Sequence, residues 1–240
     1  MKSSLLLILS VLFLLSCSKK ENSTSSTSQK PLVKTISVDT TLMGSYWYDG
    51  QGRLTCSRTL ESPVIDSTVY FYGNNSLDRK KYHDGTLIEI EHSILESGYV
   101  VSMNGIKADS SSFWSTYYTY DENGYLIHEI HMDNDTVETW RVEYQVVNGN
   151  VVSMNRINYI PLVCTYEYYP GTTNSLGSME NIDRFGFYNS KNLVKKISIN
   201  YSFGTPIEED YTYEYYDNGW VKKMTSTVNT QITNNYFTYW

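Results

Sequence analysis

The chain has 240 residues, a formal net charge of −7 and 23 tyrosines. An acidic chain without a basic run lacks the electrostatic footprint of proteins that bind nucleic acid or polyanionic lipid headgroups, so we expect neither partner. A glycine-rich phosphate loop, a G-x-S-x-G elbow and an H-E-x-x-H motif do not occur in the sequence, which therefore nominates no catalytic residue, cofactor or metal site. We expect a protein that is not an enzyme.

The N-terminus has the pattern of an export signal. Lys2 supplies a positive charge, and Leu5 to Leu15 form an apolar run that is shorter than the roughly 20 residues of a membrane-spanning helix. Leu14-Leu15-Ser16-Cys17 resembles the bacterial lipoprotein signal. The resemblance implies that residues 1–16 are removed and that several acyl chains on Cys17 hold the protein on a membrane. A plain secretory signal with an incidental cysteine is the alternative.

The residues after Cys17 bear on location and domain organisation. Ser18 follows the cysteine, and by resemblance to other lipoproteins the absence of Asp at this position favours the outer membrane, on its periplasmic face or at the cell surface. Residues 17–30 read as the lipidated cysteine and a flexible Ser/Thr-rich tether, because the stretch after Cys17 has no apolar residue to offset its chain entropy. Residues 31–240 show no second low-complexity break, so we expect one domain there.

Alternating polar and apolar residues predict strands throughout this domain. In the run 138–146 the two faces separate cleanly, with Trp140, Val142, Tyr144 and Val146 against Thr139, Arg141, Glu143 and Gln145. In the run 86–94 the isoleucines share the face opposite Glu89 and Glu91, and in the run 193–201 Lys195 interrupts an apolar face. Such alternation is typical of antiparallel strands with one wet face.

Regularly spaced turn residues set the expected topology. Asn-Gly and Asp-x-x-Gly sequences recur between the predicted strands, and both suit tight hairpins. We therefore expect an all-β fold, an antiparallel up-and-down meander of about 12 to 15 strands that is curved or barrel-like. The one long break, Pro170 to Phe185, is the longest irregular segment and the best single place for a specific contact. A short helix around residues 178–184 is expected within it.

Two frames repeat along the chain. Tyr-x-Tyr-Asp-x-x-Gly-x-Leu occurs at residues 46–54 and 118–126, and a copy shifted by one residue occurs at 213–219. A second frame, Gly-x-apolar-x-x-apolar, begins at Gly85, Gly98, Gly149 and Gly219, and at Asn192 with Asn in place of Gly. Repetition at the length of a hairpin indicates a repeated structural unit rather than a repeated chemical site.

These frames carry a family resemblance. The first frame resembles the YD repeat of Rhs-type shell proteins. The stretches TYEYYPG, DRFGFYNSKNLVKKI and YTYEYYDNGWVKKM resemble an uncharacterised family of gut-bacterial lipoproteins, described as a domain of unknown function with a porin-like fold. The resemblance is best over residues 166–224. It implies an all-β, barrel-like body without a membrane-spanning role, and it implies no reaction, because that family has no established active site.

Three polar motifs are candidates for chemistry, and each has a simpler interpretation. The two histidines of His128-Glu129-Ile130-His131 are three residues apart, so on a strand they point to opposite faces and cannot chelate one ion. Asp133-Asn134-Asp135 lacks the later residues of a calcium loop and is expected to be a hairpin turn. The acidic run Glu208-Glu209-Asp210 is expected to be a solvated loop. Cys56 and Cys164 are expected to be buried free thiols, although an oxidising envelope would permit a disulfide.

The tyrosines of the repeats are the remaining candidate ligand contacts. They are Tyr46, Tyr48, Tyr118, Tyr120, Tyr213 and Tyr215. Exposed aromatic faces can stack on sugars, but recurring Tyr-x-Tyr pairs also form cross-strand ladders. The sequence thus favours a lipid-anchored envelope protein with a binding or structural role, whose partner is a glycan or another envelope protein. A glycan-binding lipoprotein of a polysaccharide-uptake system and an outer-membrane β-barrel, supported by the aromatic C-terminus, are the alternatives.

Overall fold

A computed structural model describes residues 32–61, 64–134, 136–158, 160–176, 190–202 and 204–240. These residues form sixteen β-strands. The strands are, in chain order, β1 (Val33–Val38), β2 (Thr41–Tyr48), β3 (Leu54–Glu61), β4 (Val64–Tyr72), β5 (Ser76–His83), β6 (Thr86–Glu96), β7 (Tyr99–Lys107), β8 (Phe113–Tyr120), β9 (Leu126–Asp133), β10 (Val137–Val147), β11 (Asn150–Ile157), β12 (Leu162–Tyr168), β13 (Val194–Tyr201), β14 (Ile207–Tyr215), β15 (Val221–Val228) and β16 (Gln231–Tyr239). This part of the chain contains no helix with the length and hydropathy of a membrane span.

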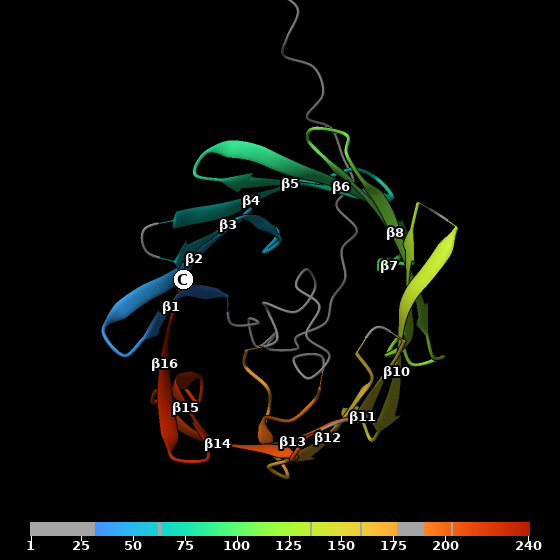
Figure 1. The fold of residues 1–240 in the computed structure, drawn as a ribbon. Helices are drawn as coiled ribbons and strands as arrows, with labels where there is room; N and C mark the ends of the chain where they lie inside the picture. The colour runs from blue at the N-terminus through green and yellow to red at the C-terminus, as the bar shows by residue number, and fades with distance from the viewer. Residues whose placement is uncertain (1–31, 62–63, 135, 159, 177–189, 203) are drawn as a thin grey trace, which may run out of the picture.

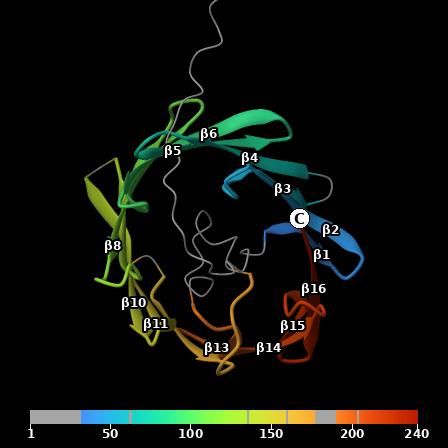
Figure 2. The ribbon, with the colours of Figure 1, turned by 180° about the vertical axis from the view of Figure 1, so that it is seen from behind.

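The strands close into a barrel. Each strand pairs antiparallel with the next, and β1 pairs with β16 to complete the ring (Figures 1 and 2). An even number of strands brings the start of β1 and the end of β16 to the same end of the barrel, which we call the terminal rim. We call the other end the distal rim. The all-β, up-and-down, barrel-like fold expected from the sequence is confirmed, and the sheet closes completely.

Tight turns explain both the topology and the strand count. Three two-residue turns, Asp84-Gly85, Ser97-Gly98 and Asn148-Gly149, have positive φ at both residues, which matches the right-handed twist of the strands they join. The sequence predicts 12 to 15 strands and the described residues contain sixteen. Two distal turns, Asp39-Thr40 and Asn229-Thr230, have no glycine, so they lack the main signal that separates two strands in a sequence.

The copies of the second repeated frame at Gly98, Gly149, Asn192 and Gly219 correspond to a β-bulge at the terminal rim, and the copy at Gly85 corresponds to a bulge at the distal rim. The register shifts by one residue where β2, β6, β8, β10, β12 and β14 pair with the next strand. On β15, for example, Lys222 is the extra residue, because Tyr215 pairs with Val221 and Glu214 with Lys223. The bulge lets residues three apart share one face, so that Val221 and Met224 are both buried.

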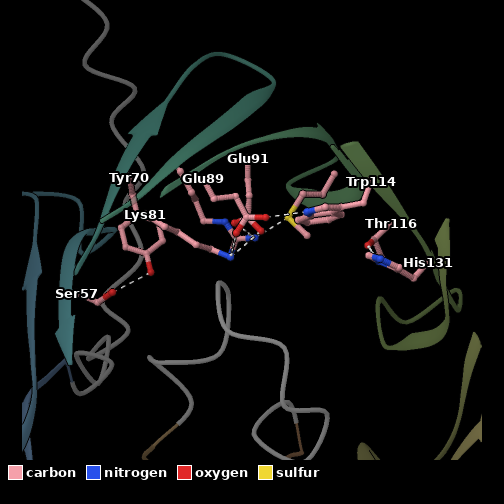
Figure 3. A network of polar contacts seen from close by, with 10 residues as sticks. Ser57, Tyr70, Lys81, Glu89, Glu91, Trp114, Thr116 and His131 are labelled. Atoms are coloured by element: carbon pink, nitrogen blue, oxygen red, sulfur yellow. Dashed lines mark hydrogen bonds and ion pairs between the residues drawn. The ribbon is translucent and has the colours of Figure 1, made fainter. Parts of the chain in front are cut away.

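Cross-strand registers divide the side chains into a luminal and an outer set. Ion-paired residues such as Lys81 and Glu91 lie on the concave side of the wall (Figure 3), and paired residues point to the same face. Following the registers from there, the main hydrophobic cluster also faces inward; it includes Val33, Ile197, Tyr211, Met224 and Phe237. Burial of each such side chain contributes about 1.5–3 kcal/mol, so the lumen side of β11–β16 and β1 holds the core.

The wet face expected from the sequence is reversed on β6. Ile90 and Ile94 do lie opposite Glu89 and Glu91, as the alternation predicts. However, Glu91 points inward and is fully buried, while Ile94 points outward and is 44% exposed. Ile88 is the extra residue of another bulge. The polarity of the two faces therefore differs between the halves of the barrel.

Candidate functional site

Charged side chains gather on the luminal side of β5 and β6. The register places Arg79 opposite Glu91 and Lys81 opposite Glu89, and Trp114 reaches the same place from β8 (Figure 3). We call these five residues the luminal polar cluster. They share one place because the side chains of alternate residues on a strand point to the same face, and both strands present a charged pair there.

The cluster is held by short polar contacts. Arg79 Nη2 lies 2.8 Å from Glu91 Oε2, and Lys81 Nζ lies 3.0 Å from Glu91 Oε1 and 2.9 Å from Glu89 Oε2. The indole N–H of Trp114 donates to Glu89 Oε1 at 2.7 Å. A charge removed from water is stable only when it is paired and hydrogen-bonded, so the two cations compensate the buried Glu91. Lys81 and Glu89 remain partly exposed and could contact a ligand.

A glycine on β7 makes room for Trp114. Gly105 pairs directly with Trp114, and a Cβ at this position would overlap the indole ring. Gly105 has an ordinary φ, so glycine is needed here because the indole lies close to the backbone and not because of a special backbone conformation. The glycine thus sets how deeply Trp114 lies and allows it to reach Glu89.

An aromatic stack continues from the cluster along β8, β9 and β10. The rings of Trp114 and His131 have centroids 5.2 Å apart, and His131 and Trp140 lie 4.9 Å apart with an interplanar angle of 3°. Thr116 Oγ1 lies 3.0 Å from His131 Nδ1 and orients the imidazole. Because His131 stacks between the two indoles, its ring faces are turned toward Trp114 and Trp140.

A second buried carboxylate lies beside the stack. Glu129 on β9 is buried and accepts a hydrogen bond from the Tyr144 hydroxyl at 3.2 Å. Burial, reinforced by the negative charge of Glu129, raises the pKa of Tyr144, so this phenol stays neutral and acts as a donor. Carboxylates, indoles and an imidazole therefore line one half of the luminal wall.

Comparison with known proteins bears on the fold. No family model matches the chain, and no curated protein matches it. Among solved structures, a porin-like protein from Bacteroides uniformis matches with a TM-score of 0.67, covering 87% of this chain and 95% of its own, at 13% identity. A porin-like protein from Bacteroides vulgatus matches with a TM-score of 0.59, covering 86% and 98%, at 12% identity. The barrel is porin-like. Neither protein is named as an enzyme.

The porin-like barrel distributes the six candidate tyrosines over three strands. Tyr46 and Tyr48 lie on β2, Tyr118 and Tyr120 on β8, and Tyr213 and Tyr215 on β14. The structure does not bring these strands together, because β1, β15 and β16 separate β2 from β14 and other strands separate both from β8. Their use as ligand contacts stays a prediction.

Several tyrosine hydroxyls have a structural partner. Each donates to the carbonyl just before a bulge on the preceding strand: Tyr72 to Leu54, Tyr120 to Val100, Tyr168 to Val151, Tyr213 to Val194 and Tyr239 to Val221, at 2.6–3.0 Å. A bulge disrupts the ladder locally, and a buried carbonyl needs a donor. We call these five residues the rim tyrosines. Burial raises the pKa of Tyr120, Tyr168 and Tyr239 to about 12.

The three polar motifs identified in the sequence are not part of the luminal polar cluster, although individual residues of these motifs lie beside it. His128 is exposed on the outer wall while His131 faces inward, as their spacing predicts. Asp133 and Asn134 begin the expected turn, and Asp135 lies outside the described residues. The expected loop at Glu208–Asp210 is wrong: these residues lie within β14, where Glu208 pairs with Lys196 at 2.6 Å. The described residues contain no group of three His, Cys, Asp or Glu side chains placed to hold a metal.

The remaining predicted residues are only partly described. Cys17, the tether and the residues of the expected helix lie outside the described part of the chain. The described start of the long break packs inward, because Leu176 joins the main hydrophobic cluster and the Ser175 hydroxyl accepts the Val221 N–H at 3.1 Å. Cys56 and Cys164 are free, as expected, with Cys164 buried and Cys56 half-buried.

Sequence reasoning missed the luminal polar cluster, although a signal for it exists. Arg79-x-Lys81 and Glu89-x-Glu91 are opposite charges arranged about the Asp84-Gly85 turn. Continuing the register of His83 with Thr86 without a shift would place Arg79 opposite Ile90, on the wrong face. The bulge at Ile88 moves the pairing by one residue and brings Arg79 to Glu91. The charge pattern therefore predicts the cluster only when the position of the bulge is known.

Proposed function

We propose that the protein is a lipid-anchored component of the bacterial outer membrane, held through Cys17, whose barrel is a non-catalytic binding module that does not span the bilayer. The lipoprotein-like sequence Leu14-Leu15-Ser16-Cys17 supports the anchor. The porin-like fold is compatible with an envelope location. The domain boundaries that go with this proposal are residues 1–16 for the signal, 17–30 for the lipidated tether and 31–240 for the barrel.

The charged outer wall of β13–β15 supports the proposal that the barrel does not span the bilayer. On this wall Lys196 pairs with Glu208 at 2.6 Å and Lys223 with Glu214 at 3.1 Å, and Asp210 lies between them on β14. A Lys or Arg on the lipid face of a membrane barrel is destabilising by about 2–4 kcal/mol at the bilayer midplane. In water the same pairs are close to neutral in energy, so this wall is compatible with solvent.

Extraction experiments test the anchor and the barrel separately. We expect the wild-type chain to sediment with membranes and to need detergent for release. The Cys17→Ala chain, produced with a plain secretory signal in place of residues 1–16, should be recovered in a detergent-free soluble fraction with an unchanged circular dichroism spectrum. If this variant still needs detergent, the barrel itself spans the membrane and the outer-membrane β-barrel is the better description. If the wild type needs no detergent, the anchor proposal is wrong.

The luminal polar cluster favours a polar ligand, and a glycan is the second candidate. Indoles and carboxylates together are the groups that proteins use to bind sugars through stacking and hydrogen bonds. Glu89 and Lys81 are partly exposed donors and acceptors at this place. Both carboxylates of the cluster contact cations, rather than facing each other across an open point as glycosidase pairs do, which supports binding without hydrolysis.

Binding measurements test the glycan candidate. We expect an oligosaccharide found on a glycan array to quench or shift tryptophan fluorescence of the full chain. Glu89→Gln should weaken binding at least several-fold, because Glu89 is partly exposed and is oriented by Trp114. Glu214→Gln, a carboxylate on the outer wall, is the matched control and should leave binding unchanged. Equal loss in both variants, or no glycan bound at all, would exclude the cluster as a sugar site.

A further inference from the structure

The two rims of the barrel differ in their exposed aromatic side chains. Around the terminal rim these are Trp47, Tyr99, Tyr215, Tyr216 and Trp240, with Phe71 one residue inside the end of β4. Of the described exposed aromatics only Tyr201 lies at the distal rim. The described distal turns carry polar residues at positive φ, such as Asp39 and Asn229, and the exposed apolar side chains near this rim, such as Ile160 and Ile232, are mostly aliphatic. The exposed aromatic side chains are therefore polarised along the axis of the barrel.

The N-terminal segment joins the barrel at the aromatic end. The backbone N–H of Trp240 donates to the carbonyl of Leu32 at 3.1 Å, immediately before β1. Fourteen residues separate Cys17 from Leu32, and Leu32 lies at the terminal rim. An acylated Cys17 would thus hold the terminal rim closer to the lipid than the distal rim.

Trp240 has the surroundings of an interfacial side chain. Its indole N–H donates to the Tyr46 carbonyl at 3.0 Å, and the Lys34 ammonium lies 4.2 Å from its ring centroid. The residue is nevertheless 59% exposed. Trp47 and Leu32 lie beside it, around a pocket of about 270 Å³. An indole whose N–H is hydrogen-bonded and whose ring lies beside a lysine suits the headgroup region of a bilayer, where tryptophan and tyrosine are enriched.

Two of the acidic residues at this rim, Asp49 and Asp121, are turned toward their own turns. Asp49 Oδ1 accepts the N–H groups of Gln51 and Arg53, and Asp121 Oδ1 accepts those of Asn123 and Tyr125. These bonds stabilise the YD-type turns and engage oxygens that would otherwise repel phosphate. The described residues of this rim show no excess of basic side chains, so contact with lipid would depend on aromatic burial more than on anionic headgroups.

We propose that the terminal rim lies against a lipid surface, with the exposed side chains of Trp47, Trp240, Tyr99, Tyr215 and Tyr216 at the headgroup level. The orientation rests on the proposed lipid anchor, because the tether determines which end meets the membrane. A lipid surface fits better than a glycan here, since the exposed rings are spread around the rim rather than gathered at one pocket. The only carboxylate among the residues around that pocket is Asp49, which is already engaged.

Dye labels at the two ends of the full chain test this orientation. Gly50 lies in the turn between β2 and β3, and a Cβ there meets no atom within 4 Å; Thr230 lies in a distal turn. Gly50→Cys and Thr230→Cys each provide one reactive thiol, because acylation blocks Cys17 and burial raises the pKa of the Cys56 and Cys164 thiols. On phosphatidylcholine vesicles, we expect quenching by iodide to fall several-fold at position 50 and to stay unchanged at position 230.

Two controls make the result decisive. Trp47→Ser with Trp240→Ser should restore quenching at position 50, whereas Ile232→Ser, an equally exposed side chain near the distal rim, should not. A second chain carries Cys17→Ser and a hexahistidine insertion after Ser18, and binds nickel-chelating lipid. This chain supplies the tether even if Cys17 is not acylated, so a failed anchor and a failed orientation are distinguishable. Equal quenching at both positions on tethered vesicles overturns the proposal, as does protection of position 50 by soluble glycan alone.

Discussion

Glu91 carries a carboxylate at a position that water does not reach. Arg79 and Lys81 lie within 3.0 Å of its oxygens, and this pairing replaces the lost hydration. The pairs on the outer wall, such as Lys223 with Glu214, have the same chemistry but remain in contact with solvent. The same type of ion pair should therefore differ strongly in energy between the two sides of the barrel wall.

Substitution of one member of each pair measures this difference. Glu91→Gln should lower the free energy of unfolding by about 3 kcal/mol, because it leaves two cations facing a neutral amide in a buried place. Glu214→Gln should lower it by less than about 1 kcal/mol. Denaturant unfolding followed by circular dichroism checks both. Equal effects would mean that the luminal polar cluster is hydrated in solution.

The rim tyrosines give the protein a distinct alkaline response. The pKa of Tyr120 and Tyr239 is about 12 in the folded state, against 10.0 for a free phenol. A raised folded pKa contributes stability that is fully present below pH 10 and is lost as the pH rises toward 12. The unfolded chain then releases its phenolic protons before the folded chain does, so unfolding becomes more favourable across this window.

Replacement by phenylalanine isolates this contribution. At pH 8, Tyr120→Phe should lower the free energy of unfolding by about 1 kcal/mol, because the Val100 carbonyl loses its donor. At pH 11.5 the difference from wild type should shrink, since phenylalanine cannot ionise. Tyr117→Phe, on the exposed outer wall, serves as the control and should behave as wild type at both pH values. A penalty that grows with pH would contradict the assignment.

At the scale of the element, the β-bulge is the feature that recurs from strand to strand. One extra residue near the terminal-rim start of β3, β7, β9, β11, β13 and β15 changes which side chains face inward for the rest of that strand. This explains why the apolar residues of the second frame are three apart, although a regular strand has period two. It also explains why Lys195 interrupts an apolar run in the sequence. Lys195 is the extra residue of β13, and its Nζ lies 3.7 Å from Glu167 Oε2.

Deletions at one bulge test this role. Deletion of Lys222 alone leaves Val221 and Met224 two residues apart, so both still face inward on a regular strand, whereas deletion of Lys222 and Lys223 together makes them neighbours on opposite faces. We expect the double deletion to lower the free energy of unfolding by about 2–5 kcal/mol, the range for losing one buried side chain of this size, and the single deletion to cost less. Lys222→Ala keeps the bulge and should change stability by less than about 0.5 kcal/mol. A double deletion as mild as the alanine variant would show that the sheet absorbs the shift.

At the scale of the whole molecule, closure depends on the β1–β16 seam. Thr35 pairs with Thr238 across it, and their hydroxyl oxygens lie 2.6 Å apart. These two residues stand at opposite ends of the chain, so their contact exists only when the ring is complete. The seam thus reports directly on the closed state of the barrel.

A disulfide at this seam tests closure. Thr35→Cys with Thr238→Cys should form a bond under mild oxidation and raise the free energy of unfolding, by up to about 5 kcal/mol for a loop of this length. Thiol titration and the melting temperature with and without reductant check the result. Each single variant is the control and should show no stabilisation. Two free thiols in the oxidised double variant would mean that the seam is open in solution.

The sequence alone was enough for the type and order of most elements, since alternation and turn residues are local signals, although Glu208–Asp210 lies in β14 and not in the expected loop. Runs such as 138–146 predict a strand with two distinct faces, and Asn148-Gly149 predicts the turn that follows. Near-identical copies such as GYVVSMNG and GNVVSMNR indicate a repeated hairpin rather than a site. Turns without glycine, such as Asp39-Thr40 and Asn229-Thr230, give no such signal, and the described residues contain more strands than the 12 to 15 expected.

Only the tertiary structure decided which face of each strand points inward. On β6 the choice is opposite to hydropathy, because Arg79 and Lys81 on β5 compensate Glu91 and Glu89 across a register that a bulge has shifted. Closure and the gathering of aromatic residues at the terminal rim are likewise invisible in the sequence. These features depend on pairings between residues far apart in the chain, and no local pattern encodes such pairings.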